Sequence, residues 1–166
     1  QSVRDRALGE LERAREALGE VMREGGDPAA VRLDVRRFRG LLPAPVDAEV
    51  SVPFGDRRNR RFGTVLPHPG WDLDARFGNP VQAIFEGRVV YADWLRGYGL
   101  VVVVDHGHRV HSVFAHLSAI LVEKGTSVAQ GETIGRVGDT GSLTGPHLYM
   151  EIRVDGKAVD PADWIR

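Results

Sequence analysis

Three short segments of this 166-residue chain combine histidines with a carboxylate, the side chains that a zinc hydrolase uses. The first is His68-Pro69-Gly70-Trp71-Asp72, the second contains His116 and the third contains His147. A catalytic zinc ion is commonly held by three protein ligands, with a water molecule in the fourth position. The bound water loses its proton near neutral pH, and further histidines can handle that proton. If the fold brings these segments to one sheet face, they could form a hydrolytic site.

The composition narrows the choice of metal ligands and partners. The chain has no cysteine, so any metal must be held by histidine, aspartate or glutamate. Its formal net charge of -1 gives no field that would hold a polyanion, which disfavours nucleic acid as a partner. No window approaches the roughly 18 apolar residues that a membrane span needs. Because the chain begins with Gln1 and not with a methionine and an apolar leader, we expect a fragment that lacks its leader.

The first 41 residues predict helices. From Ser2 to Glu24 there is no proline, and apolar residues at steps of four and three form a heptad seam: Ala7, Leu11, Ala14, Leu18 and Val21. Such a seam packs either within the chain or against a coiled-coil partner. A capping residue and a proline at Asp27-Pro28 predict a second short helix that ends near Gly40.

After Pro43 and Pro45 the chain changes to short β-rich runs separated by glycine. We predict strands over Val81–Ile84, Gly87–Ala92, Leu100–Asp105, Val110–His116, Thr133–Val137 and Leu148–Val154. Strands at this spacing favour a mainly β domain with a mostly antiparallel, barrel-like sandwich. We therefore assign residues 42–166 to this domain and residues 1–41 to a helical segment.

The ordered set of motifs resembles the signature of LytM (lysostaphin-like) zinc peptidases, which cut peptidoglycan cross-bridges. The motifs are His68-x-Gly70-x-Asp72, Ala115-His116-Leu117, Val137-Gly138-Asp139-Thr140-Gly141 and Gly145-Pro146-His147-Leu148, and the resemblance covers residues from about 43 to 164. It implies the LytM fold for the β domain. It also implies that His68 and Asp72 bind zinc and that His116 and His147 are catalytic.

Tyr149 departs from this pattern, because the family has its third zinc ligand, a histidine, two residues after the position of His147. Side chains two apart in a strand share a face, so Tyr149 should point with His147 and Glu151, while Leu148, Met150 and Ile152 point to the core. A phenol titrates near ~10 and is an uncommon zinc ligand. We therefore expect zinc to be bound weakly or not at all.

A second resemblance, to the EnvC-type branch of murein hydrolase activators, rests on Ala92–Leu100 and Leu148-Tyr149-Met150-Glu151-Ile152-Arg153. It implies a degenerate peptidase site whose groove activates periplasmic N-acetylmuramoyl-L-alanine amidases in peptidoglycan remodelling and daughter-cell separation. We assign Tyr149, Trp71 and Glu151 to that partner-binding groove. The segment 38–46 is similar to the join between the coiled coil and the LytM domain of this branch. Residues 1–40 would then end a coiled coil that reaches a membrane division complex, or form an arm that restrains the groove.

Two other readings remain open. In one, the chain is a zinc-dependent peptidoglycan endopeptidase in which Tyr149 or a water replaces the third ligand, because His68, Asp72, His116 and His147 are all present. In the other, it is a passive wall-binding module. All three readings place the chain in the periplasm or cell envelope and make peptidoglycan or a wall amidase its partner.

Overall fold

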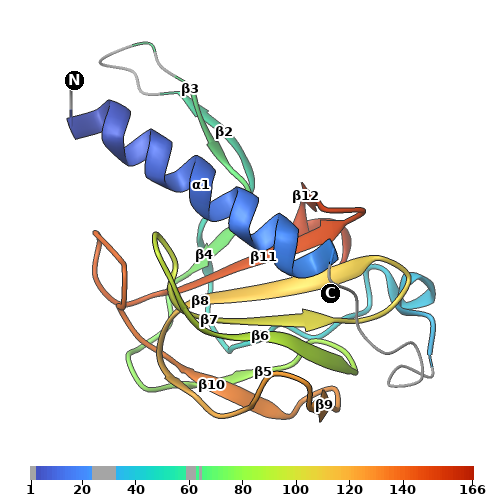
Figure 1. The fold of residues 1–166 in the computed structure, drawn as a ribbon. Helices are drawn as coiled ribbons and strands as arrows, with labels where there is room; N and C mark the ends of the chain where they lie inside the picture. Colours follow the sequence, from blue (N-terminus) through green and yellow to red (C-terminus); the bar gives the residue numbers. More distant parts are fainter. Residues whose placement is uncertain (1–2, 24–32, 59–62, 64) are drawn as a thin grey trace.

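One curled, ten-stranded sheet forms most of the molecule (Figure 1). This computed structural model describes residues 3–23, 33–58, 63 and 65–166. Along the main path the order is β1-β4-β11-β8-β7-β6-β9, and every strand pair is antiparallel. The bounds are β1 Val50–Val52, β4 Trp71–Leu73, β11 Leu148–Val154, β8 Val110–Ile120, β7 Gly99–Asp105, β6 Gly87–Leu95 and β9 Ser127–Val128.

Two further strand groups complete the β structure. The strand β10 pairs with both β8 and β5, which curls the sheet, and β12 pairs with β11. A separate ribbon joins β2 to β3. Their bounds are β5 Pro80–Gln82, β10 Thr133–Val137, β12 Lys157–Val159, β2 Gly55–Arg58 and β3 Val65–His68. The expected mainly β, antiparallel architecture is therefore confirmed.

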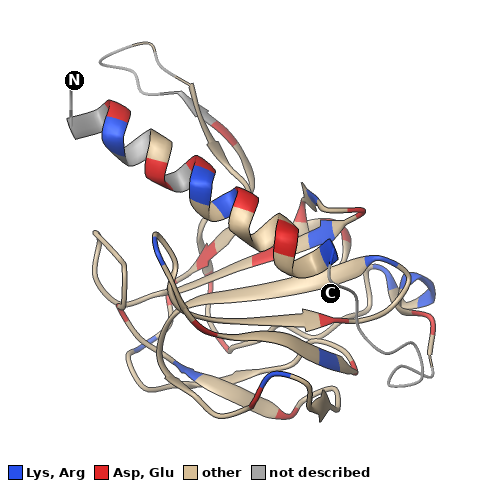
Figure 2. Cartoon of the chain, viewed as in Figure 1, with Lys and Arg blue, Asp and Glu red and all other residues tan. Residues whose placement is uncertain are grey.

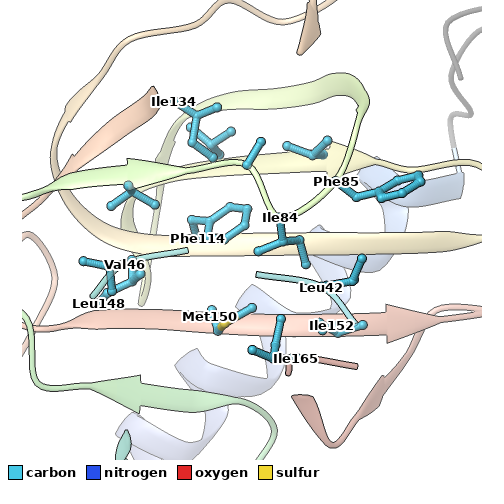
Figure 3. Close-up of a cluster of buried hydrophobic side chains, with 14 of the residues drawn as sticks. Leu42, Val46, Ile84, Phe85, Phe114, Ile134, Leu148, Met150, Ile152 and Ile165 are labelled. Atoms are coloured by element: carbon cyan, nitrogen blue, oxygen red, sulfur yellow. The ribbon is translucent and has the colours of Figure 1, made fainter. Parts of the chain in front are cut away.

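The main core lies inside the curl of the sheet (Figure 3). Phe114 of β8, Met150 of β11 and Ile134 of β10 are fully buried there. Val35 and Leu42, from the segment before the sheet, belong to the same core. Leu42 also forms a parallel bridge with Ile165, which ties that segment to the C-terminal end. Residues 33–48 thus help to build the body on which the sheet rests.

The helix α1, Val3–Arg23, crosses the other face of the sheet (Figure 1). Charged residues occur along much of α1, whereas the central strands β7 and β8 carry few (Figure 2). Its apolar residues Ala14, Leu18 and Met22 are buried against that face. The described C-terminal part of the heptad seam, from Ala14 to Val21, therefore packs within the chain, and a coiled coil with another chain stays a prediction.

The second predicted helix is wrong in its described part. There the chain forms only the four-residue 3-10 helix η2, Val35–Phe38, and residues 27–32 lie outside the described residues. Asp34 is extended, with φ -83 and ψ 106, and its carboxylate accepts from the Arg36 amide at 3.0 Å. Gly40, with φ 83, turns the chain soon after the helix ends. The cap is thus Asp34 and not Asp27, about two helical turns later than expected, which limits the helix. A second 3-10 helix, η3 Pro161–Asp163, follows β12.

Candidate functional site

A pocket of about 250 Å³ brings together all four residues for which the sequence predicts chemistry. His68 ends β3, Asp72 lies in β4, and His116 lies in β8. His147 stands immediately before β11. Tyr149, two residues along β11, lines the same pocket. The register pairs Tyr149 with Asp72 on one side and with Ala115 on the other, which explains why these strands converge here.

The two predicted metal ligands, His68 and Asp72, are in direct polar contact. The Nε2 atom of His68 lies 3.2 Å from Oδ1 of Asp72, and its Nδ1 lies 2.9 Å from the Pro53 carbonyl oxygen. Burial alone would lower the pKa of His68, but the hydrogen bond and charge of Asp72 outweigh it, so the pKa is raised. Zinc bonds of about 2.0–2.2 Å put neighbouring tetrahedral ligand atoms about 3.3 Å apart. The pair therefore has the spacing of one edge of a zinc site.

The rings of His116 and His147 lie next to each other at a tilt of 55°, with centroids 4.9 Å apart. His116 donates from Nδ1 to the Thr140 carbonyl at 2.8 Å, and burial lowers its pKa. Its backbone has φ 60, a strained value for a residue that is not glycine. His147 places Nδ1 3.0 Å from the Gly145 carbonyl and Nε2 3.6 Å from Oδ1 of Asp72. With Nδ1 of His116 engaged as a donor, its Nε2 remains able to accept a proton.

Tyr149 turns its hydroxyl away from the metal-ligand pair. The hydroxyl donates to Oε1 of Glu151 at 2.7 Å, while the ring packs edge-on against His68 with centroids 5.7 Å apart. Burial raises the pKa of Tyr149 well above its ordinary value, so the side chain stays a neutral phenol. Coordination of a metal would require both the loss of this buried hydrogen bond and deprotonation.

The residues present do not fit a complete zinc site. Among the described residues no group of three or more histidine, cysteine, aspartate or glutamate side chains is arranged to hold a metal ion. Two ligands with suitable spacing remain, His68 and Asp72. The third position holds Tyr149, whose hydroxyl is hydrogen-bonded to Glu151. Affinity for zinc should therefore be low compared with a three-ligand site.

Glu151 is fully buried at the centre of a hydrogen-bond network beside the pocket. Tyr149 and Tyr98 both donate to its Oε1, at 2.7 and 3.3 Å, and Arg153 donates from Nε to its Oε2 at 2.9 Å. A buried carboxylate is tolerated when such partners satisfy it. Sequence reasoning missed Tyr98 and Arg153, although the alternation along β11 would have placed Arg153 on the face of Tyr149 and Glu151.

The three residues assigned to a partner-binding groove lie at different depths. Tyr149 lines the pocket although only 8% of it is exposed, and Glu151 lies beneath it. Trp71 is partly buried and packs against the main core. Their role in binding a partner stays a prediction, and in this state Glu151 is not accessible to one.

The helix α1 closes one side of the pocket. Arg15 lines the pocket and donates from Nη2 to the Pro67 carbonyl at 3.5 Å. Arg96, at the tip of the β6–β7 hairpin, is ion-paired with Glu10 of α1. Beneath α1, its buried residues share a cluster with Tyr98 and Tyr149. An arm that restrains the groove was one of the two roles that the sequence resemblance implied for residues 1–40, but no local pattern identified Arg15 and Arg96 as contact residues.

Comparisons with known proteins agree with this geometry. The model of peptidase family M23 matches residues 66–161. The chain is 46% identical over 116 residues to the murein hydrolase activator EnvC of Escherichia coli, a match that covers 70% of this chain and 28% of that protein. It is 40% identical over 125 residues to the peptidoglycan DD-endopeptidase ShyA of Vibrio cholerae, over 74% of this chain and 29% of that protein. The chain thus spans less than a third of these relatives.

Solved structures give the same fold. A putative M23 peptidase from Pseudomonas aeruginosa has a TM-score of 0.75 and 32% identity, over 96% of this chain and 62% of that chain. A zinc-containing peptidase from Vibrio cholerae has a TM-score of 0.69 and 32% identity, over 75% and 40%. The relatives therefore include both an activator and peptidases.

Proposed function

This chain belongs to peptidase family M23, and we propose that it is a non-catalytic activator of periplasmic N-acetylmuramoyl-L-alanine amidases. Its role would lie in peptidoglycan remodelling and daughter-cell separation, in the periplasm or cell envelope. The observation that carries the proposal is Tyr149: a neutral phenol, bonded to Glu151, stands where a working site needs a ligand. The 46% identity to EnvC supports the same conclusion.

In this proposal the pocket serves as a binding surface. A segment of the amidase binds along the pocket that Tyr149 and His68 line, and binding there releases the inhibition of the amidase. The helix α1 competes for that surface, because it already covers Tyr149 and places Arg15 in the pocket. An upstream coiled coil that reaches a membrane division complex would deliver the activator to its site of action.

Amidase stimulation on purified peptidoglycan tests the proposal. The protein alone should release no peptides from the wall, but it should accelerate glycan release by a purified periplasmic amidase. Arg153→Ala should reduce this stimulation, because it leaves the buried charge of Glu151 uncompensated beneath Tyr149. The matched control is Arg109→Ala, an exposed arginine at the turn before β8. Failure to stimulate any amidase, even after α1 is removed, would refute the proposal.

A second function, zinc-dependent endopeptidase activity, is favoured by one observation. His68, Asp72, His116 and His147 are all present and all line one pocket. In this alternative Tyr149 or a water replaces the third ligand. Zinc-dependent release of peptides from purified wall, abolished by His116→Ala, would establish it, and an inert protein at saturating zinc would exclude it.

A further inference from the structure

His111 is a buried histidine that takes no part in the pocket. It is the second residue of β8 and is only 6% exposed. Within the part of the chain that the structure describes, neither of its ring nitrogens has a hydrogen-bond partner. Buried polar side chains nearly always have a partner, so each exception needs an explanation. The position of His111 relative to α1 offers one.

His111 lies on the sheet face that α1 covers. Because side chains alternate along a strand, His111 points to the same face as Val113 and Ala115, which belong to the cluster that contains the buried residues of α1. Its register partner on β11 is Arg153, which lines a hollow of about 510 Å³ together with Arg23 from the last turn of α1. Figure 1 shows the same end of α1 beside β11 and β12. The last turns of α1 therefore lie over the row of the sheet that carries His111.

The sheet surrounds His111 with charged and titratable groups. Asp105, its register partner on β7, places Oδ2 3.8 Å from Nε2 of His111, which is too long for a hydrogen bond. Burial lowers the pKa of His111 and outweighs the opposite effect of Asp105, and the charge of Arg153 lowers the pKa further. The neighbouring His106 has a pKa of about 4, so it adds no charge above that pH. The ring of His111 is therefore neutral at pH 7 while α1 is docked.

The helix supplies no net charge that would stabilise a proton on His111. It lines the hollow beside Arg153 with two carboxylates and two guanidinium groups, from Glu16, Glu20, Arg15 and Arg23. These charges offset one another. A proton on His111 would put a further positive charge beside Arg153, on a face that the apolar side of α1 covers.

We propose that His111 is a pH-sensitive release for α1: at acidic pH its ring takes up a proton, the docked helix is destabilised, and the sheet face that carries Tyr149 opens. The release is a property of the fold, whereas its effect on amidase activation rests on the proposed function. Once α1 lifts, water reaches the ring and its pKa returns towards about 6.5. Because the docked state has the lower pKa, the contribution of His111 to docking is complete above pH 6.5 and is lost as the pH falls.

Hydrogen exchange of the whole chain tests the release. The protection factors of the α1 amides, each corrected for the intrinsic exchange rate at that pH, should fall by about threefold or more between pH 7 and pH 5.5. One linked proton changes the opening equilibrium by up to about tenfold per pH unit. In His111→Gln, whose side chain does not titrate, the protection factors should stay constant, and His111→Leu provides a second variant with the same expectation. The matched control is His108→Gln, which removes an exposed histidine of the neighbouring turn and should keep the fall.

Two results would overturn the release. One is constant protection of α1 in the unmodified chain, or an equal fall in both His111 variants. The other is equal protection factors for α1 and β8 at each pH, because the acid sensitivity would then belong to unfolding of the whole domain.

Amidase stimulation separates this inference from the proposed function. The ratio of stimulation by the unmodified chain to stimulation by His111→Gln, measured with one purified periplasmic N-acetylmuramoyl-L-alanine amidase, cancels the pH dependence of the amidase itself. This ratio should rise about threefold from pH 7 to pH 5.5, in proportion to the opening of α1. If no amidase is stimulated while α1 still loses protection, the proposed function is wrong and the release stands. If an amidase is stimulated while the protection of α1 stays constant, the proposed function stands and the release is wrong. A constant ratio despite the loss of protection would overturn the regulatory role of His111.

Discussion

Tyr149 does two things at one position: it removes a metal ligand and adds a packing surface. Its hydroxyl satisfies Glu151, and its ring belongs to the cluster that α1 covers. A histidine in its place would have a shorter reach and would leave one oxygen of Glu151 with only the 3.3 Å bond from Tyr98. The position thus favours helix docking over metal binding.

Tyr149→His should raise the affinity for zinc by at least about tenfold, because it restores the third ligand beside His68 and Asp72. Isothermal titration of the metal-free protein with zinc measures the change. Tyr149→Phe is the control, since it removes the same hydroxyl without supplying a ligand and should leave zinc affinity unchanged. Equal affinity in all three proteins would mean that more of the site than Tyr149 has decayed.

His106 predicts a pH dependence of stability far from the pocket. It is fully buried, donates from Nδ1 to the Glu86 carbonyl and accepts at Nε2 from the Ser112 hydroxyl. Burial lowers its pKa to about 4, so the unfolded chain binds a proton near pH 6.5 that the folded chain refuses. The contribution of neutral His106 to the free energy of unfolding is therefore present above pH 6.5 and is lost as the pH falls. The free energy of unfolding should drop by about 2 kcal/mol between pH 7 and pH 5 for this reason.

Urea unfolding at several pH values checks this prediction. His106→Asn should lower stability at pH 7 but should also flatten the pH dependence of the unfolding free energy. The control His108→Asn changes an exposed histidine in the neighbouring turn and should keep the full slope. An identical slope in the His106 variant would show that other groups cause the acid sensitivity.

At the scale of elements, all six predicted runs overlap strands, but the two longest strands, β6 and β8, continue past their predicted ends to Leu95 and Ile120. The bounds of β10 and β11 agree with the predicted runs, because each run is rich in β-branched and apolar residues and lies between glycine-containing turns. The strand β4 was missed because Trp71-Asp72-Leu73 is too short to show alternation. Yet β4 is what brings Asp72 beside Tyr149, since the two are register partners.

The sequence predicted which residues line the site, but it did not predict the hydrogen bonds that they make. Motif order identified His68, Asp72, His116 and His147, and all four line the pocket. The hydrogen bond from Tyr149 to Glu151 follows from burial, which no local pattern shows. The docking of Arg15 at Pro67 joins residues 52 positions apart and depends on how the helix crosses the sheet.

The substitution Gly99→Ala tests the contact between the β6–β7 hairpin and the loop that contains Thr140. The carbonyl of Thr140 also accepts the hydrogen bond from His116. Gly99 has φ 70, and its new Cβ would lie 2.1 Å from the Thr140 carbonyl oxygen. We expect a loss of stability about 2 kcal/mol or more beyond that of Gly131→Ala. Gly131 has φ 84 with no atom within 4 Å, so it carries the same backbone strain without the clash. Equal losses by thermal or urea unfolding would contradict the prediction.

At the scale of the whole molecule, the boundary of the removable N-terminal part lies before η2. The predicted division placed residues 1–41 in a helical segment, and that division stays a prediction. Val35 is fully buried in the main core, and Phe38 packs against it with ring centroids 5.3 Å from Phe85. A truncation at residue 40 would therefore damage the body of the domain as well as remove α1.

Removal of residues 1–23 alone should raise the affinity for the amidase without changing the fold. Because α1 covers Tyr149 and places Arg15 in the pocket, only the fraction of molecules with α1 displaced can bind. The apparent dissociation constant equals the intrinsic constant divided by that fraction, so the full chain binds more weakly. We expect about tenfold tighter binding for the truncated chain by isothermal titration. Leu18→Asp should have the same effect in the full chain, since it puts a charge on a fully buried contact of α1, whereas Glu12→Ala changes an exposed position and should not. If both the truncation and Leu18→Asp bind the amidase as the unmodified chain does, α1 is a structural element of the fold and not a competitor for the pocket.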